Sequence, residues 1–308
     1  MRLVTYSVDN NPRLGAWIDP YVLDIKGAVI HLLGEAGRSD MIISACQSLQ
    51  NLLQAGKEAW DVVHATVGKV SRDFGRSRQE LIVLGILRPI TDVKLLPPLA
   101  TPGKVICVAG NYPSLGADKK PDHPTIFLKP SSSVTGPGMP IILSDLTRNV
   151  AIEVELALVI SQKTRHILVE HALSCVAGYI LANDIGDREL EKRTSQWTSG
   201  KMFDSFTPMG PWLVTKDEIP DPNTLQMTSL VNGKVVQKGN TSEMFFNCLE
   251  LISILSNLTT LYPGDVILTG STKCMDDKAN PTVSLTPGDT VSINIEGLGV
   301  LSNPVIKE

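Results

Sequence analysis

Three acidic residues have the spacing of a metal site. Glu153 and Glu155 lie one residue apart in the apolar run 152–160, and Asp184 ends a second apolar run that begins at residue 177. Alternate side chains of a strand point to one face, so the two glutamates share a face. Because carboxylates buried together need a compensating charge, and oxygen ligands suit hard cations, we predict a site for Mg²⁺, or for Mn²⁺ or Ca²⁺. The alternative is an edge strand that exposes both glutamates to water.

Lys201 is the second residue with chemical potential. It follows Gly200 and precedes the apolar and aromatic run 202–206, which predicts an amino group partly withdrawn from water. Such a lysine can hold a substrate carboxylate or polarise a carbonyl group. Asp204 is a candidate to orient it through a charge-assisted hydrogen bond. The alternative is an ordinary surface lysine.

These residues belong to a longer, ordered pattern. In chain order the motifs are E-x-E at 153–155, N-D at 183–184, R-E-L at 188–190 and G-K-M-F-D-S-F-T-P-M-G-P-W at 200–212. The pattern resembles the fumarylacetoacetate hydrolase family, and further similarity extends from Lys104 to Gly299. The resemblance implies an α+β fold, the family's β-rich mixed β-sandwich roll, and a homodimer.

The resemblance also implies roles for individual residues. Glu153, Glu155 and Asp184 would bind the metal, and Lys201 would stabilise an oxyanion or enolate beside it. The matching substrate-binding positions are Tyr112, Lys129, Arg188, Glu191 and Ser271. Glu191 stands where relatives often carry glutamine. Its charge would repel a substrate carboxylate unless a cation intervenes, so we expect a substrate that differs from a simple acylpyruvate.

The chain departs from the family where protons are handled. Hydrolases of the family show N-Y-x-x-H-x-x-E after the first core strand, in which the histidine activates water. Here Leu115 takes the histidine position and cannot accept a proton, and Asp118 takes the acidic position. His123, in the Pro-flanked segment that follows, is a candidate replacement. The predicted catalytic residues are therefore Lys201, Asp118 and His123.

The resulting hypothesis is a divalent-metal-dependent enzyme acting on a 1,3-dicarbonyl or β-keto acid, as a C–C bond hydrolase or a lyase that stabilises an enolate. The alternatives are a decarboxylase, a tautomerase or isomerase, and a secondary-metabolite tailoring enzyme, all without the water-activating histidine. A last alternative is an inactive metal-binding homologue, against which the intact acidic residues and lysine argue.

Composition predicts a small-molecule partner. The 308-residue chain has a formal net charge of -4, a pI near 5.8 and five scattered cysteines without C-x-x-C spacing. The charge gives no reason to expect nucleic acid. The N-terminus lacks an apolar signal segment, and no run reaches the about 18 apolar residues that span a membrane. We predict reduced thiols, no membrane insertion and a cytoplasmic location.

The elements that must position these residues fall into two predicted parts. Three prolines and a glycine at 95–103 mark a boundary, which separates a small N-terminal α/β module with its linker, 1–100, from a catalytic domain, 101–308. Apolar spacing predicts helices over 40–55 and 58–70, and a helix over 242–258 with Thr241 as its N-cap. Asn232-Gly233 predicts a two-residue hairpin in a β-rich second part.

Overall fold

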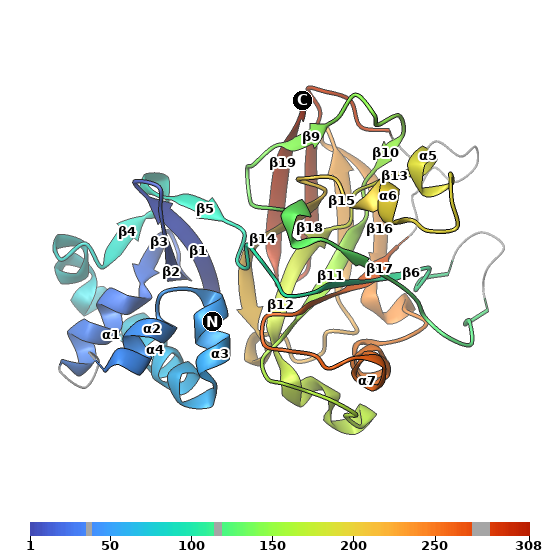
Figure 1. Cartoon of the computed structure of the whole chain (residues 1–308). Helices are drawn as coiled ribbons and strands as arrows, with labels where there is room; N and C mark the ends of the chain where they lie inside the picture. Colours follow the sequence, from blue (N-terminus) through green and yellow to red (C-terminus); the bar gives the residue numbers. More distant parts are fainter. Residues whose placement is uncertain (35–38, 114–118, 273–283) are drawn as a thin grey trace.

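The computed structural model describes residues 1–34, 39–113, 119–272 and 284–308. Its largest element is a 12-stranded sheet, in which ten strands follow the order β4-β3-β2-β1-β14-β12-β11-β17-β6-β7, while β5 pairs with β1 and β8 with β14 (Figure 1). These strands are β1 (Arg2–Val8), β2 (Asn11–Ile18), β3 (Tyr21–Asp24), β4 (Leu87–Pro89), β5 (Lys94–Leu96), β6 (Val105–Ala109), β7 (Thr125–Lys129), β8 (Val134–Thr135), β11 (Val154–Ile160), β12 (Val176–Asn183), β14 (Thr207–Thr215) and β17 (Val266–Ser271).

A second, five-stranded sheet packs against the large one. Its order is β16 (Lys234–Asn240), β15 (Gln226–Val231), β18 (Thr290–Ile295), β19 (Gly299–Lys307) and β9 (Ile141–Leu143). Leu156 and Leu181 of the large sheet belong to the same buried apolar cluster as Ile293 and Leu301 of the second. This shared core fixes the two sheets face to face, as expected when each buries one apolar face. A short pair, β10 (Val150–Ala151) and β13 (Gly186–Asp187), lies beside them.

The N-terminal part adds four helices to the first strands. They are α1 (Ile25–Leu33), α2 (Asp40–Ala45), α3 (Leu49–Ala55) and α4 (Lys57–Val83), grouped at one end of the molecule in Figure 1. Strand β1 pairs antiparallel with β14, with Leu3 opposite Leu213, so the large sheet continues from this part into the rest of the chain. The fold is thus α+β and β-rich, with an N-terminal α/β region, as predicted. The domain boundary at residue 100 stays a prediction.

Two helix predictions in this region need correction. The single helix expected over 40–55 is two helices, because the Ser48 hydroxyl accepts a hydrogen bond from Asn51 N at 3.1 Å and begins a new helix there. The helix expected over 58–70 continues to Val83 as α4. The apolar faces were predicted correctly, since Ile42, Leu49 and Leu52 are buried.

The second part confirms the predicted hairpin and shortens the predicted helix. Asn232 and Gly233 join β15 to β16 with φ values of 51° and 78°, the left-handed conformations that this dipeptide favours. Helix α7 spans Cys248–Leu258 and begins six residues after the predicted start. Asn247 caps it, with Glu250 closing a capping box, so Thr241 is not its N-cap. In the described part of the chain, two short α-helices follow β13: α5 (Arg188–Glu191) and α6 (Thr198–Lys201).

Strand β11 decides between the two interpretations of the E-x-E motif. It lies inside the large sheet, between β12 and β17, and all 7 of its residues are buried. The alternative of a solvated edge strand is therefore wrong.

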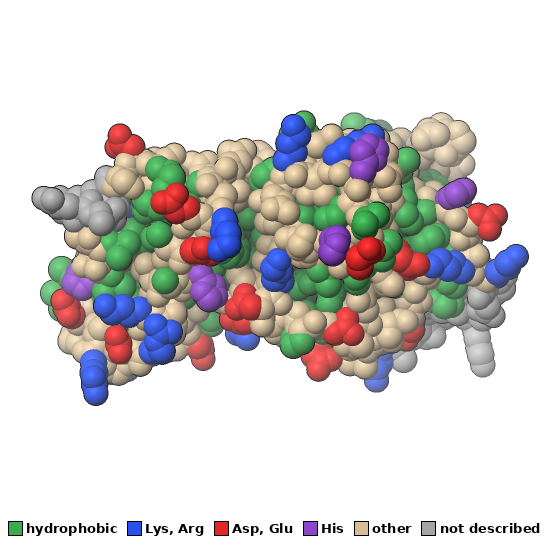
Figure 2. Space-filling model, turned by 90° about the horizontal axis from the view of Figure 1, so that it is seen from below, with side chains coloured by type: hydrophobic (Ala, Val, Ile, Leu, Met, Phe, Trp, Pro, Cys, Tyr) green, Lys and Arg blue, Asp and Glu red, His purple; other side chains and the backbone are tan. Residues whose placement is uncertain are grey.

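Among the described residues, none of the helices is both long and apolar enough to cross a bilayer. On the face seen from below, acidic and basic side chains are interspersed (Figure 2). The homodimer and the cytoplasmic location stay predictions.

Candidate metal centre

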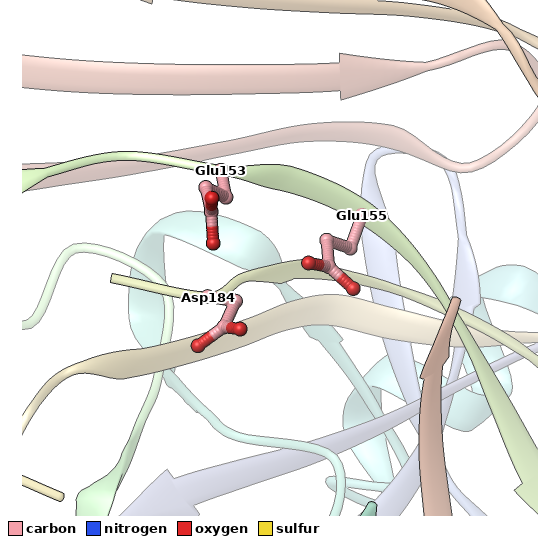
Figure 3. A group of neighbouring side chains, drawn as sticks. All are labelled: Glu153, Glu155 and Asp184. Carbon is pink, nitrogen blue, oxygen red and sulfur yellow. The ribbon is translucent and has the colours of Figure 1, made fainter. Parts of the chain in front are cut away.

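The ends of β11 and β12 bring the three predicted metal ligands together. The strands are antiparallel, with Val154 opposite Asn183. Glu153, just before β11, therefore lies beside Asp184, just after β12. Asp184 N donates to Glu153 O at 2.9 Å, and Glu153 N donates to the Asn183 side chain at 2.9 Å. One carboxylate oxygen from each of Glu153, Glu155 and Asp184 lies within 4.8 Å of the others. Figure 3 shows the three side chains facing a common space.

Two cations neutralise Glu153. Arg188 Nη2 lies 2.5 Å from its Oε1, and Lys201 Nζ lies 2.5 Å from its Oε2. Burial of the carboxylate opposes ionisation, but the two positive charges outweigh it and lower the pKa of Glu153 to about 2. Glu153 is therefore ionised at neutral pH.

A buried lysine, Lys129, binds the Asp184 carboxylate from the interior of the protein. Lys129 Nζ donates to its Oδ1 at 2.6 Å, and also to the carbonyl oxygens of Ile185 and Phe206. The Lys129 side chain is fully buried and does not line the cavity. All three of its ammonium donors have protein partners. The structure therefore does not place Lys129 in contact with a substrate, although the sequence had predicted this contact. Lys129 fixes the direction of the Asp184 carboxylate instead.

Glu155 is the least compensated of the three carboxylates. It is 2% exposed, and among the described residues its side chain accepts one hydrogen bond, from Gly270 N at 2.7 Å. Burial, together with the charges of Asp184 and Glu153, raises the pKa of Glu155 well above its ordinary value. An additional positive charge at this point would relieve the excess, so a divalent cation fits the residues present.

Lys201 reaches the same group of carboxylates. Besides Glu153, its Nζ contacts Asp184 Oδ2 and Asp184 O, each at 3.0 Å. Burial would lower the pKa of Lys201, but Asp184 and Glu153 outweigh it and raise the pKa, so the group stays an ammonium ion. The predicted orienting partner Asp204 is exposed, and the bonds that hold Lys201 come from the metal-site carboxylates instead.

A cavity of about 290 Å³ opens beside the acidic group. Its lining includes Lys201 and the predicted residues Arg188, Glu191 and Ser271. No histidine or cysteine is part of this lining within the described ranges, so the donor set is all oxygen and favours Mg²⁺, Mn²⁺ or Ca²⁺ over Zn²⁺.

Two predicted residues lie elsewhere, and a third is outside the described part of the chain. Tyr112 is buried in the core and donates from its hydroxyl to Met227 Sδ at 3.3 Å, so the structure does not bring it to the cavity. His123 is exposed and does not line the cavity. Asp118 falls outside the described residues, as does Leu115.

The structure adds residues that the sequence analysis missed. Phe127 and Trp197 line the cavity and pack edge to face, with ring centroids 5.9 Å apart, and Lys192 also belongs to the lining. Gln237, from the second sheet, donates to Ser271 Oγ at 2.9 Å and accepts from Val154 N at 3.1 Å. The tryptophan in the polar stretch 192–199 was the one feature of the sequence that could have indicated these cavity residues. Nothing local marks Gln237, because its partners lie on other strands.

Comparisons with known proteins show what the chain is similar to. The family model described as fumarylacetoacetate (FAA) hydrolase C-terminal matches residues 104–306. The mitochondrial oxaloacetate tautomerase FAHD2A of Homo sapiens is 43% identical over 223 residues, 71% of each chain.

Two solved structures cover almost the whole length. Fumarylacetoacetate hydrolase from Exiguobacterium antarcticum is 29% identical, with a TM-score of 0.80 over 100% of both chains. Maleylpyruvate hydrolase from Sphingobium sp. SYK-6, in complex with manganese (II) ion and pyruvate, is 28% identical, with a TM-score of 0.71 over 100% of this chain and 99% of that one. The fold expected from the sequence resemblance is confirmed.

Proposed function

The chain belongs to the fumarylacetoacetate hydrolase family, and from this premise we propose that it is a divalent-metal-dependent tautomerase of a small β-keto acid, with oxaloacetate as the substrate. Whatever its reaction, the chain is an enzyme of this superfamily with an acidic group that could hold a metal ion. The observation that carries the proposal is the 43% identity to an oxaloacetate tautomerase over 223 residues. Among the alternatives from the sequence, this one replaces C–C bond hydrolysis as the leading hypothesis.

Tautomerisation suits a site without a water-activating base. The C3–H bond of the keto acid breaks and its proton passes to solvent, while its electron pair forms the C2=C3 double bond. The π pair of the C2 carbonyl moves to oxygen, which takes a proton from solvent, so no water is consumed. Hydrolysis requires an activated water as well. Leu115 stands where hydrolases of the family place their histidine, and the described cavity lining offers no histidine in its place.

In this proposal, the bound cation and Lys201 both stabilise negative charge on the substrate. A divalent cation bound by Glu153, Glu155 and Asp184 would supply electrophilic stabilisation of negative charge on the keto oxygen. Lys201, an ammonium ion at the cavity wall, would donate a hydrogen bond to the same developing charge. Because it is protonated, Lys201 acts as a donor and not as the base.

The rim of the cavity supports a dianionic substrate. Lys192 lines the cavity, is exposed, and forms no hydrogen bond or ion pair with the residues that the structure describes. Its ammonium group can therefore meet a second carboxylate, as in oxaloacetate, without giving up a protein partner. The site is also small enough to favour a short acid over a large one.

The test is a direct assay of keto–enol interconversion. The enol form of oxaloacetate is added to the purified chain with Mn²⁺ or Mg²⁺, and the decay of its ultraviolet absorbance is compared with the decay in EDTA and with Glu155→Gln. We expect metal-dependent acceleration that the variant lacks. In parallel, acylpyruvates and fumarylacetoacetate are tested by product mass. If the protein cleaves one of these two substrate types in a metal-dependent reaction but does not accelerate enol decay, the tautomerase proposal is refuted. C–C bond hydrolysis would then be the better hypothesis.

A further inference from the structure

One oxygen of Glu191 lies buried without a partner. The residue is 7% exposed, and its Oε2 accepts a hydrogen bond from Arg188 Nη1 at 2.9 Å. Its Oε1 is buried and accepts no hydrogen bond within the part of the chain that the structure describes. Lys201 Nζ lies 3.9 Å from this oxygen, which is too far for a hydrogen bond. Because a buried, unpaired carboxylate oxygen is unfavourable, the arrangement points to a second state in which a donor reaches it.

Two glycines keep the space around this oxygen open. A Cβ atom at Gly186 would lie 2.1 Å from Glu191 Oε1 and 2.8 Å from Lys201 Cε. A Cβ atom at Gly200 would lie 2.7 Å from Glu191 Cγ. Neither glycine has a positive φ, so close approach, and not backbone conformation, excludes a side chain at both positions. The chain thus leaves Lys201 and Glu191 free to approach each other.

A divalent cation would change the partners of Lys201. In the structure Lys201 and Arg188 both contact Glu153, and Lys201 also contacts Asp184. An ion among the three metal-site carboxylates would take up their negative charge and repel both cationic groups. Arg188 already has a second carboxylate oxygen, Glu191 Oε2. For Lys201, the unpaired carboxylate oxygen within reach among the described residues is Glu191 Oε1.

We propose that Glu191 is a positioning residue, which receives Lys201 when a divalent cation occupies the acidic site. The ammonium group would leave Glu153 and Asp184 Oδ2 and bind Glu191 Oε1, while it keeps its hydrogen bond to Asp184 O. The inference rests on the metal site of the proposed function and not on the identity of the substrate.

The exchange gives Lys201 its role in the reaction. An ammonium group has three donors. In the structure they are directed to Glu153, to Asp184 O and to Asp184 Oδ2. After the exchange, Asp184 O and Glu191 Oε1 take two, and the third is free for an oxygen of the substrate. Lys201 would thus become a substrate donor only after the cation has bound, so the cation should bind before the substrate.

The test is a double-mutant cycle on Mn²⁺ affinity, measured by electron paramagnetic resonance of free Mn²⁺. The proteins are the wild type, Glu191→Gln, Lys201→Met and the double variant. Glutamine keeps the size of the side chain but not its charge, so in the wild-type background we expect the Kd for Mn²⁺ to rise about tenfold. In the Lys201→Met background there is no ammonium group to receive, and the same change should alter Kd by less than about twofold. Glu189→Gln, an exposed charge on the same helix, is the matched control and should change Kd by less than about twofold.

Two outcomes of the cycle would overturn the proposal. Equal losses in both backgrounds would mean that Glu191 acts on the ion through its charge alone, and no loss in either would mean that it does not act. If wild-type Mn²⁺ binding is itself absent, the metal site fails together with the proposed function. If binding is present but Glu191 and Lys201 are uncoupled, this inference fails alone.

A second measurement does not depend on the variants folding. In a crystal structure of the wild type with Mn²⁺, Lys201 Nζ should lie within about 3.2 Å of Glu191 Oε1. A lysine that remains bonded to Glu153 beside the bound Mn²⁺ would contradict the proposal.

Discussion

Glu153 and Glu155 should respond in opposite ways to neutralisation, although both are proposed ligands of one ion. Glu153→Gln removes the acceptor of two charge-assisted hydrogen bonds. Its folded pKa is depressed, so its contribution to stability is present above the ordinary value of 4.5 and is lost as the pH falls toward 2. At about 1.4 kcal/mol per pKa unit, that interval corresponds to about 3 kcal/mol, which the variant should lose at neutral pH.

Glu155→Gln should stabilise the metal-free protein. The pKa of Glu155 is raised in the fold by burial and by Asp184 and Glu153, so its ionised form destabilises the folded state at neutral pH. Glutamine keeps an acceptor for Gly270 N and carries no charge. We therefore expect a gain of about 1–3 kcal/mol in the free energy of unfolding, the range for relief of a poorly compensated buried polar group.

Urea unfolding at neutral pH, in EDTA and in excess Mn²⁺, separates the two effects. The wild type should gain about 2.7 kcal/mol at a free Mn²⁺ concentration of 100 times Kd, and both variants should lose that gain. Glu189→Gln, exposed and outside the cavity, is the control and should change stability by less than about 1 kcal/mol. A Glu155→Gln protein that is less stable than the wild type in EDTA, or that keeps the Mn²⁺ gain, would refute the reasoning.

Three further predictions follow from the same geometry. In EDTA, the stability advantage of Glu155→Gln should shrink as the pH falls toward about 4.5, since the wild-type carboxyl is then protonated in the folded state and increasingly so in the unfolded chain; an advantage independent of pH would contradict the raised pKa of Glu155. His123→Ala should keep kcat/KM for oxaloacetate within about twofold, because this side chain is exposed and outside the cavity lining, and a loss of about a hundredfold would identify it as the base. Lys129→Met should lower the free energy of unfolding by about 3–5 kcal/mol in EDTA, because it leaves the buried Asp184 without one of its two cationic partners, and an unchanged unfolding midpoint would argue against the buried pair.

Local patterns were enough to predict several elements. The alternation around Glu153 and Glu155 requires a strand with both carboxylates on one face, and Asn232-Gly233 requires a hairpin, because strand period and turn conformation depend on neighbouring residues only. Helix ends were predicted less well. Ser48 and Asn247 begin helices inside segments whose apolar spacing looks continuous, and the cap forms where the chain must turn to pack.

Contacts between distant segments could not be predicted. Tyr112 follows a conspicuous asparagine, yet it packs in the core against Met227, more than a hundred residues away. Gln237 reaches the site from the second sheet. Lys129 binds Asp184 from the protein interior and not from the cavity. These positions depend on how two sheets pack, and no local pattern encodes that packing.

The sequence by itself determined which acidic groups this protein places together, because strand alternation and the N-D strand end leave little choice. It could not determine their charge. Glu153 and Glu155 are the same residue type two positions apart, but two cations lower the pKa of one and burial beside like charges raises that of the other. Since pKa values depend on burial and on distances to charges from other elements, only the tertiary structure made one an ordinary ion-paired carboxylate and left the other in need of a cation.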